Sequence, residues 1–199
     1  MENVIFPNDR HVKVAFTGCS NDCAKVRMAD FGIIGMTEPQ YDPNRCVACE
    51  QCIKYCKKRS VDALSLVNGK IVRDTKKCIG CGVCITYCPT RAWTRSKEHY
   101  FRLVILGRTG KRNPRLAEDF IKWCDEESIL KIAANTYAYI EEYIDPEAVE
   151  NKEHIGYIVD RTGFEKFKEY IFRDVSLSEK AEVAQEVYWG GKHYDRYGG

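Results

Sequence analysis

Residues 46–56 read CVACEQCIKYC and residues 78–89 read CIGCGVCITYCP. Both segments follow the spacing Cys-x2-Cys-x2-Cys-x3-Cys, so eight of the eleven cysteines of the 199-residue chain belong to two copies of one pattern. The cysteine count is odd, and the first residues, MENVIFPNDR, lack the basic stretch and apolar region of a secretory signal. Clustered cysteines in such a chain, which we expect to be cytoplasmic, indicate metal binding rather than disulfides.

The doubled spacing is typical of bacterial ferredoxins that hold two [4Fe–4S] clusters. Three thiolates at x2 intervals hold three corners of a cubane, and the x3 step starts a helical turn that directs the fourth cysteine toward the other cluster. The predicted ligation is therefore crossed. Cluster one takes Cys46, Cys49, Cys52 and Cys88, and cluster two takes Cys78, Cys81, Cys84 and Cys56. Two structural zinc sites are the alternative, but they use paired CxxC units, and the doubled four-cysteine spacing favours clusters.

The segment between the two cysteine runs is predicted to be a β-hairpin. Residues 63–67 and 70–73 are rich in apolar and β-branched side chains, and Asn68-Gly69 between them is the strongest short hairpin signal. Pro89 follows Cys88, whereas Lys57 follows Cys56. Because proline supplies no ligand atom, we expect the cluster to tolerate this difference.

A second cysteine pair lies between two predicted strands near the N-terminus. Residues 12–16 alternate like a strand, and residues 31–35 form a second apolar stretch. Cys19 and Cys23 lie between them in a Cys-x3-Cys spacing. Taken alone, this spacing is equally consistent with two partly buried thiols at a turn.

The surrounding residues give that pair a context, because the segment resembles the siroheme-containing sulfite and nitrite reductases. The matching residues are Gly18, Cys19, Asn21, Cys23 and Ala24, followed by Asp30, Gly32, Ile33, Ile34 and Gly35. In that family this is the second half of a split motif that binds a [4Fe–4S] cluster coupled to siroheme. The resemblance implies that Cys23 bridges the cluster to the siroheme iron, that Cys19 is a plain cluster ligand, and that Asn21 belongs to the same cofactor-binding motif.

The first half of that motif, a Cys-x5-Cys, is absent from the 18 residues before Cys19. We therefore expect siroheme and a third [4Fe–4S] cluster only in a complete protein, with this chain as a C-terminal fragment. A separate subunit that supplies the missing half is the alternative. The chain alone is expected to be incomplete and inactive as an enzyme.

A basic loop follows the second cysteine run. Residues 100–106 are predicted to be a buried strand, and residues 107–116 read GRTGKRNPRL. In the same family, such loops lie beside siroheme, whose carboxylates suit cationic neighbours. Arg108, Lys111 and Arg112 are therefore the predicted catalytic side chains, with a solvated basic turn as the alternative.

The C-terminal part is predicted to be helical. A helix from about Pro114 would place Leu116, Phe120 and Cys124 on one buried stripe, so that Cys124 is a core residue and not a ligand. Further helices are predicted at about 126–144, at 162–172 with a capping box that opens at Thr162, and from Ser176. The aromatic tail 188–197 is expected to pack on the body or a partner. The four histidines share no spacing typical of a metal site and are expected at the surface.

Charge and hydropathy exclude several classes of protein. The formal net charge is +2, which argues against a generally basic nucleic-acid binder. Residues 70–115 carry 12 Lys and Arg against 2 Asp and Glu, and residues 116–160 carry 3 against 12. An RNA-binding stripe is the alternative interpretation of the basic segment, but no nucleic-acid-binding motif accompanies it. No apolar run exceeds residues 103–106, so membrane insertion is not expected.

The predicted fold class is α+β, a ferredoxin-like two-[4Fe–4S] domain inserted into part of a siroheme-type sulfite reductase domain. The expected divisions are 1–40 (siroheme-domain half), 41–98 (ferredoxin domain), 99–175 (remainder of the siroheme domain) and 176–199 (helix and tail). This order resembles the C-type subunit of anaerobic sulfite reductases, or a dissimilatory relative with an inserted ferredoxin.

The function that this resemblance implies is the six-electron reduction of sulfite to sulfide. The two clusters would pass electrons to the siroheme centre from a donor subunit or from a ferredoxin- or NADH-linked reductase. A nitrite reductase of the same family, an electron-transfer module without catalysis, and an assembly protein are the alternatives.

Overall fold

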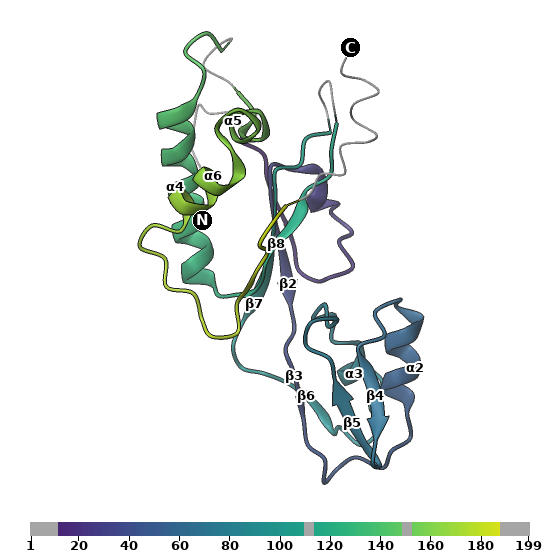
Figure 1. Ribbon diagram of the computed structural model, residues 1–199. Coiled ribbons are helices and arrows are strands. Elements are labelled where there is room, and N and C mark those ends of the chain that lie inside the picture. The colour runs from purple at the N-terminus through teal and green to yellow at the C-terminus, as the bar shows by residue number, and fades with distance from the viewer. Residues whose placement is uncertain (1–11, 110–113, 149–152, 188–199) are drawn as a thin grey trace. The chain divides into compact units, whose positions relative to one another are not determined.

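The computed structural model describes residues 12–109, 114–148 and 153–187 (Figure 1). The chain forms two compact units. The cysteine unit contains residues 18–21 and 35–100, and the sheet unit contains the described parts of 1–17, 22–34 and 101–199. The predicted ferredoxin domain was 41–98, so the structure adds residues 35–40 and the short segment 18–21 to the cysteine-rich part.

The sheet unit is built on five strands in the order β1-β2-β7-β8-β9. Their bounds are β1 Val14–Thr17, β2 Phe31–Met36, β7 Tyr100–Ile105, β8 Glu118–Cys124 and β9 Glu182–Val183. Strands β1 and β2 are parallel, and β8 is antiparallel to both β7 and β9. The strands predicted at 12–16, 31–35 and 100–106 are thereby confirmed, as is the mixed α+β class.

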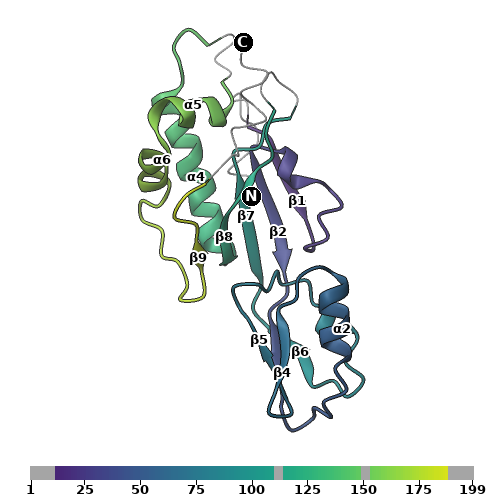
Figure 2. The same cartoon turned by 45° about the vertical axis from the view of Figure 1, so that its right-hand side comes forward.

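Three helices cover one face of this sheet, as Figures 1 and 2 show: α4 Glu126–Tyr143, α5 Ile155–Thr162 and α6 Phe164–Ile171. The side chain of Asp125 caps α4 by accepting a hydrogen bond from the Ser128 backbone N–H at 2.8 Å. Successive strand residues point to opposite faces, so Ile33 belongs to the helix-side core. Ile34 packs instead with Val26 from the short helix η1 Val26–Met28.

The helix predicted from Pro114 is wrong, because this segment is strand β8. Its pairing with β7 is interrupted by two register shifts, since Leu103 lies opposite Ile121 while Phe101 lies opposite Cys124 and Val104 lies opposite Asp119. Such bulges let neighbouring residues share one side of the sheet, which breaks the period of two and imitates a helical stripe. Cys124 is nevertheless fully buried, as predicted, although it lies on a strand.

The α4 prediction is confirmed, but the boundaries that follow it differ. Thr162 is the last residue of α5, a helix that sequence reasoning missed, and Gly163 precedes α6 without a side-chain cap. The predicted capping box is therefore wrong. The segment from Ser176 does not form the predicted helix but leads into β9, which pairs with β8. The tail 188–197 lies outside the described residues.

The surface assignment of the histidines is also wrong for His154, which is 5% exposed. Its Nδ1 lies 3.0 Å from the carboxylate of Asp30, which also accepts a hydrogen bond from the Lys13 backbone N–H. Asp30 is 1% exposed, so this buried pair ties α5 to the start of β2. His99 is exposed, and His11 and His193 lie outside the described residues.

The cysteine unit contains two short antiparallel sheets and two helices. Strand β3 Pro39–Tyr41 pairs with β6 Trp93–Arg95, and β4 Leu64–Val67 pairs with β5 Lys70–Arg73. Asn68 and Gly69 both have positive φ, as a two-residue hairpin turn requires, and the predicted hairpin is confirmed. The helices are α2 Gln51–Lys58 and α3 Val83–Thr86.

The core of the cysteine unit is made partly of its candidate ligands. Cys52, Cys56 and Cys84 are buried with five other residues: Ile53, Ala63, Leu64, Ile71 and Trp93. In the described parts of the chain, no helix has the length and apolarity needed to cross a membrane.

Candidate functional site

The two cysteine runs wrap into loops of the same backbone shape. In the first run Ala48 and Glu50 have left-handed φ values of 53° and 57°. The equivalent positions of the second run, Gly80 and Gly82, have φ values of 64° and 69°. The two left-handed residues curl each loop, and in each run the third cysteine then falls in the helix that follows, α2 or α3.

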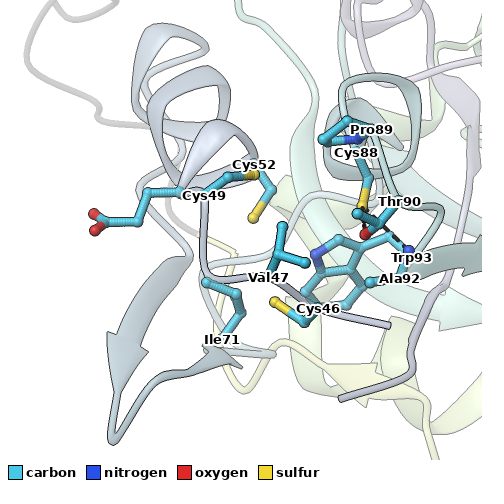
Figure 3. Close-up of a pocket in the computed structure, with 11 residues that line it drawn as sticks. Cys46, Val47, Cys49, Cys52, Ile71, Cys88, Pro89, Thr90, Ala92 and Trp93 are labelled. Carbon is cyan, nitrogen blue, oxygen red and sulfur yellow. Dashed lines mark hydrogen bonds between the residues drawn. The ribbon is translucent and has the colours of Figure 1, made fainter. Parts of the chain in front are cut away.

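Four cysteines from both runs line one pocket: Cys46, Cys49, Cys52 and Cys88. Figure 3 shows these side chains around Val47, with the ring of Trp93 and with Ile71 beside them. The fourth cysteine of the second run therefore joins the first three of the first run. This is the set that the sequence assigned to cluster one, and its ligation stays a prediction.

The other four cysteines form a second group. Cys56 lies one helical turn after Cys52 on α2, and both are buried. Burial raises the pKa of Cys56, and the nearby charges of Cys81 and Cys78 raise it further. Burial raises the pKa of Cys84 to about 12, with added contributions from the same two cysteines. Cys56 is thus close to the second run, the set predicted for cluster two.

Backbone N–H groups donate to the sulfur atoms in both groups. The donor–sulfur distances are 3.4 Å from Ala48 to Cys46, 3.3 Å from Ala63 to Cys56 and 3.2 Å from Ala92 to Cys88. Burial acts to raise the pKa of Cys88, but hydrogen bonds from the Trp93 and Ala92 backbones and the Thr90 side chain outweigh it and lower the pKa. Such donors stabilise negative charge on a thiolate.

Trp93 contributes a polar group that sequence reasoning missed. Its indole Nε1–H is buried and has no hydrogen-bond partner among the described residues, although it lines the same pocket as the four cysteines. Burial raises the pKa of Cys52, and the Trp93 N–H acts in the opposite direction. A buried donor that faces sulfur ligands suits a sulfur-rich cofactor, whose sulfide and thiolate atoms accept hydrogen bonds.

These donor sets fit [4Fe–4S] clusters. Each group offers four thiols, the number that a cubane takes, and thiolates are soft ligands that suit iron–sulfur clusters. Within the described residues, no three His, Cys, Asp or Glu side chains converge closely enough to hold one metal ion. A cubane distributes its four thiolates over four iron atoms.

The N-terminal pair lies in the loop between β1 and η1, and both thiols, Cys19 and Cys23, are exposed. The loop is held at several points. Ser20 Oγ donates to the Ile79 carbonyl at 2.5 Å, and the Arg59 guanidinium donates to Asn21 Oδ1 at 2.6 Å. Asp22 accepts a hydrogen bond from the Val26 backbone N–H at 2.8 Å, which caps η1.

The basic loop is partly built into the fold. Arg108 is 7% exposed, lies 3.1 Å from Asp160 and covers the ring of Tyr157 at 3.9 Å. Arg115, which sequence reasoning did not single out, donates to Asp160, Leu106 and Gly156. Its carboxylate partner is 45 residues away in sequence, so no local pattern announces it. Lys111 and Arg112 lie outside the described residues.

Residues 5–180 match the family model described as "Nitrite and sulphite reductase 4Fe-4S domain". This chain belongs to that family. The family resemblance inferred from the residues around Cys19 and Cys23 is therefore confirmed, and so is the prediction of [4Fe–4S] clusters as cofactors.

Among curated proteins, the chain is 40% identical over 189 residues to the C-type subunit of anaerobic sulfite reductase from Salmonella typhimurium and to its counterpart from Salmonella typhi. The match covers 95% of this chain and 56% of each relative, so the chain spans little more than half of their length. It is also 34% identical over 50 residues to a coenzyme F420-dependent sulfite reductase of Methanocaldococcus jannaschii, which covers 25% of this chain and 8% of that protein.

Among solved structures, dissimilatory sulfite reductase I resembles the chain with a TM-score of 0.57. The alignment covers 89% of this chain and 45% of that one at 18% identity, and it supports the fold assignment alone.

Proposed function

We propose that this chain is the iron–sulfur part of a siroheme-dependent sulfite reductase and delivers electrons for the six-electron reduction of sulfite to sulfide. The observation that carries the proposal is the shared pocket of Cys46, Cys49, Cys52 and Cys88, because it joins both runs as a two-cluster ferredoxin requires. Family membership and the similarity to sulfite reductase subunits support the same reaction.

The proposed ligands of cluster one are these four cysteines, and those of cluster two are Cys56, Cys78, Cys81 and Cys84. When bound, each cluster supplies a one-electron carrier of low potential. The protein holds the thiolates in place, buries them and directs N–H groups at their sulfur atoms. These contacts stabilise the added negative charge of the reduced state.

Cys19 and Cys23 are proposed as two thiolates of a third [4Fe–4S] centre, with Cys23 as the bridge to siroheme and Asn21 supporting their loop. Apart from these two, the eight run cysteines and buried Cys124, the chain contains no cysteine. The chain alone thus lacks two ligands of that centre. We propose that it holds two clusters by itself and becomes catalytic only in the complete protein.

Arg108, Lys111 and Arg112 are proposed to stabilise the anionic cofactor or substrate. The contacts of Arg108 with Asp160 and Tyr157 limit its reach, so in this proposal its part is to anchor the loop that carries Lys111 and Arg112. The proposed electron source is a donor subunit or a ferredoxin- or NADH-linked reductase. Exposed thiols and clusters need reducing surroundings, which supports a cytoplasmic location.

Iron analysis and activity together test this function. The chain, purified anaerobically, should contain about eight iron and eight sulfide per polypeptide and no siroheme absorption. The complete protein should reduce sulfite, and its Cys23→Ser variant should lose that activity while both ferredoxin clusters persist. About four iron atoms, stoichiometric zinc, or siroheme bound to the isolated chain would contradict the proposal. Because the family also includes nitrite reductases, both anions are assayed.

A further inference from the structure

The loop that carries Cys19 is attached to one of the two cysteine groups within the cysteine unit. Ser20, the residue after Cys19, donates its hydroxyl to the carbonyl of Ile79. Ile79 lies between Cys78 and Cys81, in the second run. Asn21 accepts a hydrogen bond from Arg59, whose own backbone N–H donates to the carbonyl of Cys56 at 3.2 Å. Both attachments therefore end on segments that carry group-two cysteines.

The backbone around Gly18 leads to the same group. A Cβ at Gly35 would lie 2.6 Å from the Gly18 carbonyl oxygen, so the two glycines allow a close approach of the backbones. Two residues beyond Gly35, the Thr37 N–H donates to the Gly80 carbonyl at 2.7 Å, and Thr37 forms a parallel β-bridge with Cys81. The segment that receives Gly18 is thus continuous with the one that supports the second run.

The first cysteine group is the more exposed of the two. Cys49 is exposed and Cys46 is half-buried. Val47, between them, is 66% exposed although it lines their pocket. In the second group Cys56 and Cys84 are buried, and Cys78 and Cys81 are half-buried. A redox partner therefore has direct access to the first group.

We propose that the two clusters act in a fixed order: the cluster at Cys46, Cys49, Cys52 and Cys88 receives electrons, and the cluster at Cys56, Cys78, Cys81 and Cys84 passes them to the centre at Cys19. Ser20, Asn21 and Arg59 are the positioning residues that hold the Cys19 loop against the second group. This inference rests on the proposed function, because it requires a third centre at Cys19.

The transfer involves no proton and no change of covalent bonds. One electron leaves the second-group cluster, which is oxidised from its 1+ to its 2+ state, and the Cys19 centre is reduced by one electron. The electron is replaced through the first group by a one-electron reductant such as dithionite.

Spin relaxation of the reduced clusters tests the order in the complete protein. Cys49→Ala removes the first cluster and Cys81→Ala removes the second, and each is prepared with and without Cys23→Ala, which removes the third centre. After reduction with dithionite, the remaining second cluster should relax faster when the third centre is present. The remaining first cluster should respond less. An equal or larger response of the first cluster would overturn the proposed order.

Iron content separates this proposal from the proposed function. If Cys23→Ala leaves iron and the visible spectrum unchanged, there is no third centre at Cys19, and the proposed function fails together with the relay. If iron falls but the second cluster does not sense the change, the relay alone is wrong.

A milder variant keeps all ligands and tests the positioning residues directly. Ser20→Ala combined with Arg59→Gln should retain full iron content but lose the relaxation enhancement of the second cluster. Lys58→Gln removes a neighbouring exposed cation of α2 and is the matched control, for which native relaxation is expected. Native relaxation in the double variant would overturn the positioning role.

Discussion

Trp93 is the residue whose chemistry is most sensitive to the presence of a cluster. Its buried indole N–H has no hydrogen-bond partner among the described residues and faces the pocket of the first cysteine group. A donor directed at cluster sulfur favours the reduced state, because that state carries more negative charge. Trp93→Phe keeps an aromatic ring but removes the donor.

We therefore expect Trp93→Phe to lower the reduction potential of the first cluster by about 20–60 mV, the equivalent of one ordinary hydrogen bond. A redox titration followed by electron paramagnetic resonance measures the shift, and the potential of the second cluster is the internal control. An unchanged or higher potential of the first cluster would show that the N–H does not act on it.

Cys124 is predicted to be chemically silent in the folded chain. Burial raises its pKa to about 12, so the thiol stays protonated and unreactive at about pH 8.5. Alkylation at that pH with mass-spectrometric mapping should modify exposed Cys19 and Cys23 but not Cys124. Labelling of Cys124 as fast as Cys19 would contradict its burial.

The same shift implies a loss of stability in alkaline solution. A pKa that folding raises stabilises the protein fully below the unfolded value of about 8.5, and this stabilisation is lost as the pH rises toward 12. Cys124→Ala should be less steeply destabilised by alkali over this range, at a cost of about 1 kcal/mol at neutral pH for the lost volume.

At the scale of elements, the two ligand loops differ in how much side chain they tolerate. A Cβ at Gly80 would lie 2.8 Å from Met36 Cβ, whereas a Cβ at Gly82 would meet Thr37 at 3.5 Å, an ordinary contact. Gly80→Ala should therefore destabilise the protein by about 2–4 kcal/mol and lose second-group iron, because overpacking adds to left-handed strain.

Gly82→Ala is the matched control, since it has the same backbone strain without the clash. Its expected cost is about 1 kcal/mol, with both clusters retained. Thermal unfolding and iron per chain measure both effects. Equal losses in the two variants would mean that φ, and not the contact with Met36, decides the tolerance.

Elements with a local signal could be predicted from the sequence. The Asn68-Gly69 hairpin, the apolar strands β2 and β7 and helix α4 each have their pattern within a few residues. Strand β8 could not be predicted in this way, because its bulges arise from pairing with β7 and make a strand resemble a helical stripe. The burial of Cys124 was predictable because both interpretations place it in the core.

The candidate site divides in the same manner. The cysteine spacing predicted which four thiols meet in the first pocket, since ligand spacing encodes the loop. Spacing does not reveal the attachment of Ser20 to Ile79, because the two residues are 59 positions apart in the chain. It does not reveal the Trp93 N–H either, because distant residues fix that indole: Tyr41 packs on Trp93 with ring centroids 4.6 Å apart.

At the scale of the whole molecule, the two units differ in what holds them together. The sheet unit has a large apolar core that contains no candidate ligand. In the cysteine unit three of the eight core residues are cysteines assigned to clusters. Its folding should therefore depend on iron, as in other small metal-binding domains.

We expect anaerobic iron removal by a chelator to abolish hydrogen-exchange protection in α2, β4, β5 and α3, while β2, β7 and α4 stay protected. Restoring iron and sulfide should restore protection in the cysteine unit. Simultaneous loss of protection in both units would show that the clusters stabilise the whole chain.

Crossed ligation is the central claim, and cysteine accessibility after a single ligand change tests it most directly. Cys56→Ala removes a cysteine of the first run that is assigned to the second cluster. Native, anaerobic alkylation of this variant, mapped by mass spectrometry, should label Cys78, Cys81 and Cys84 as they lose their iron. Cys46, Cys49, Cys52 and Cys88 should stay protected by the intact first cluster. Labelling of Cys46, Cys49 and Cys52 with protection of the second run would contradict crossed ligation.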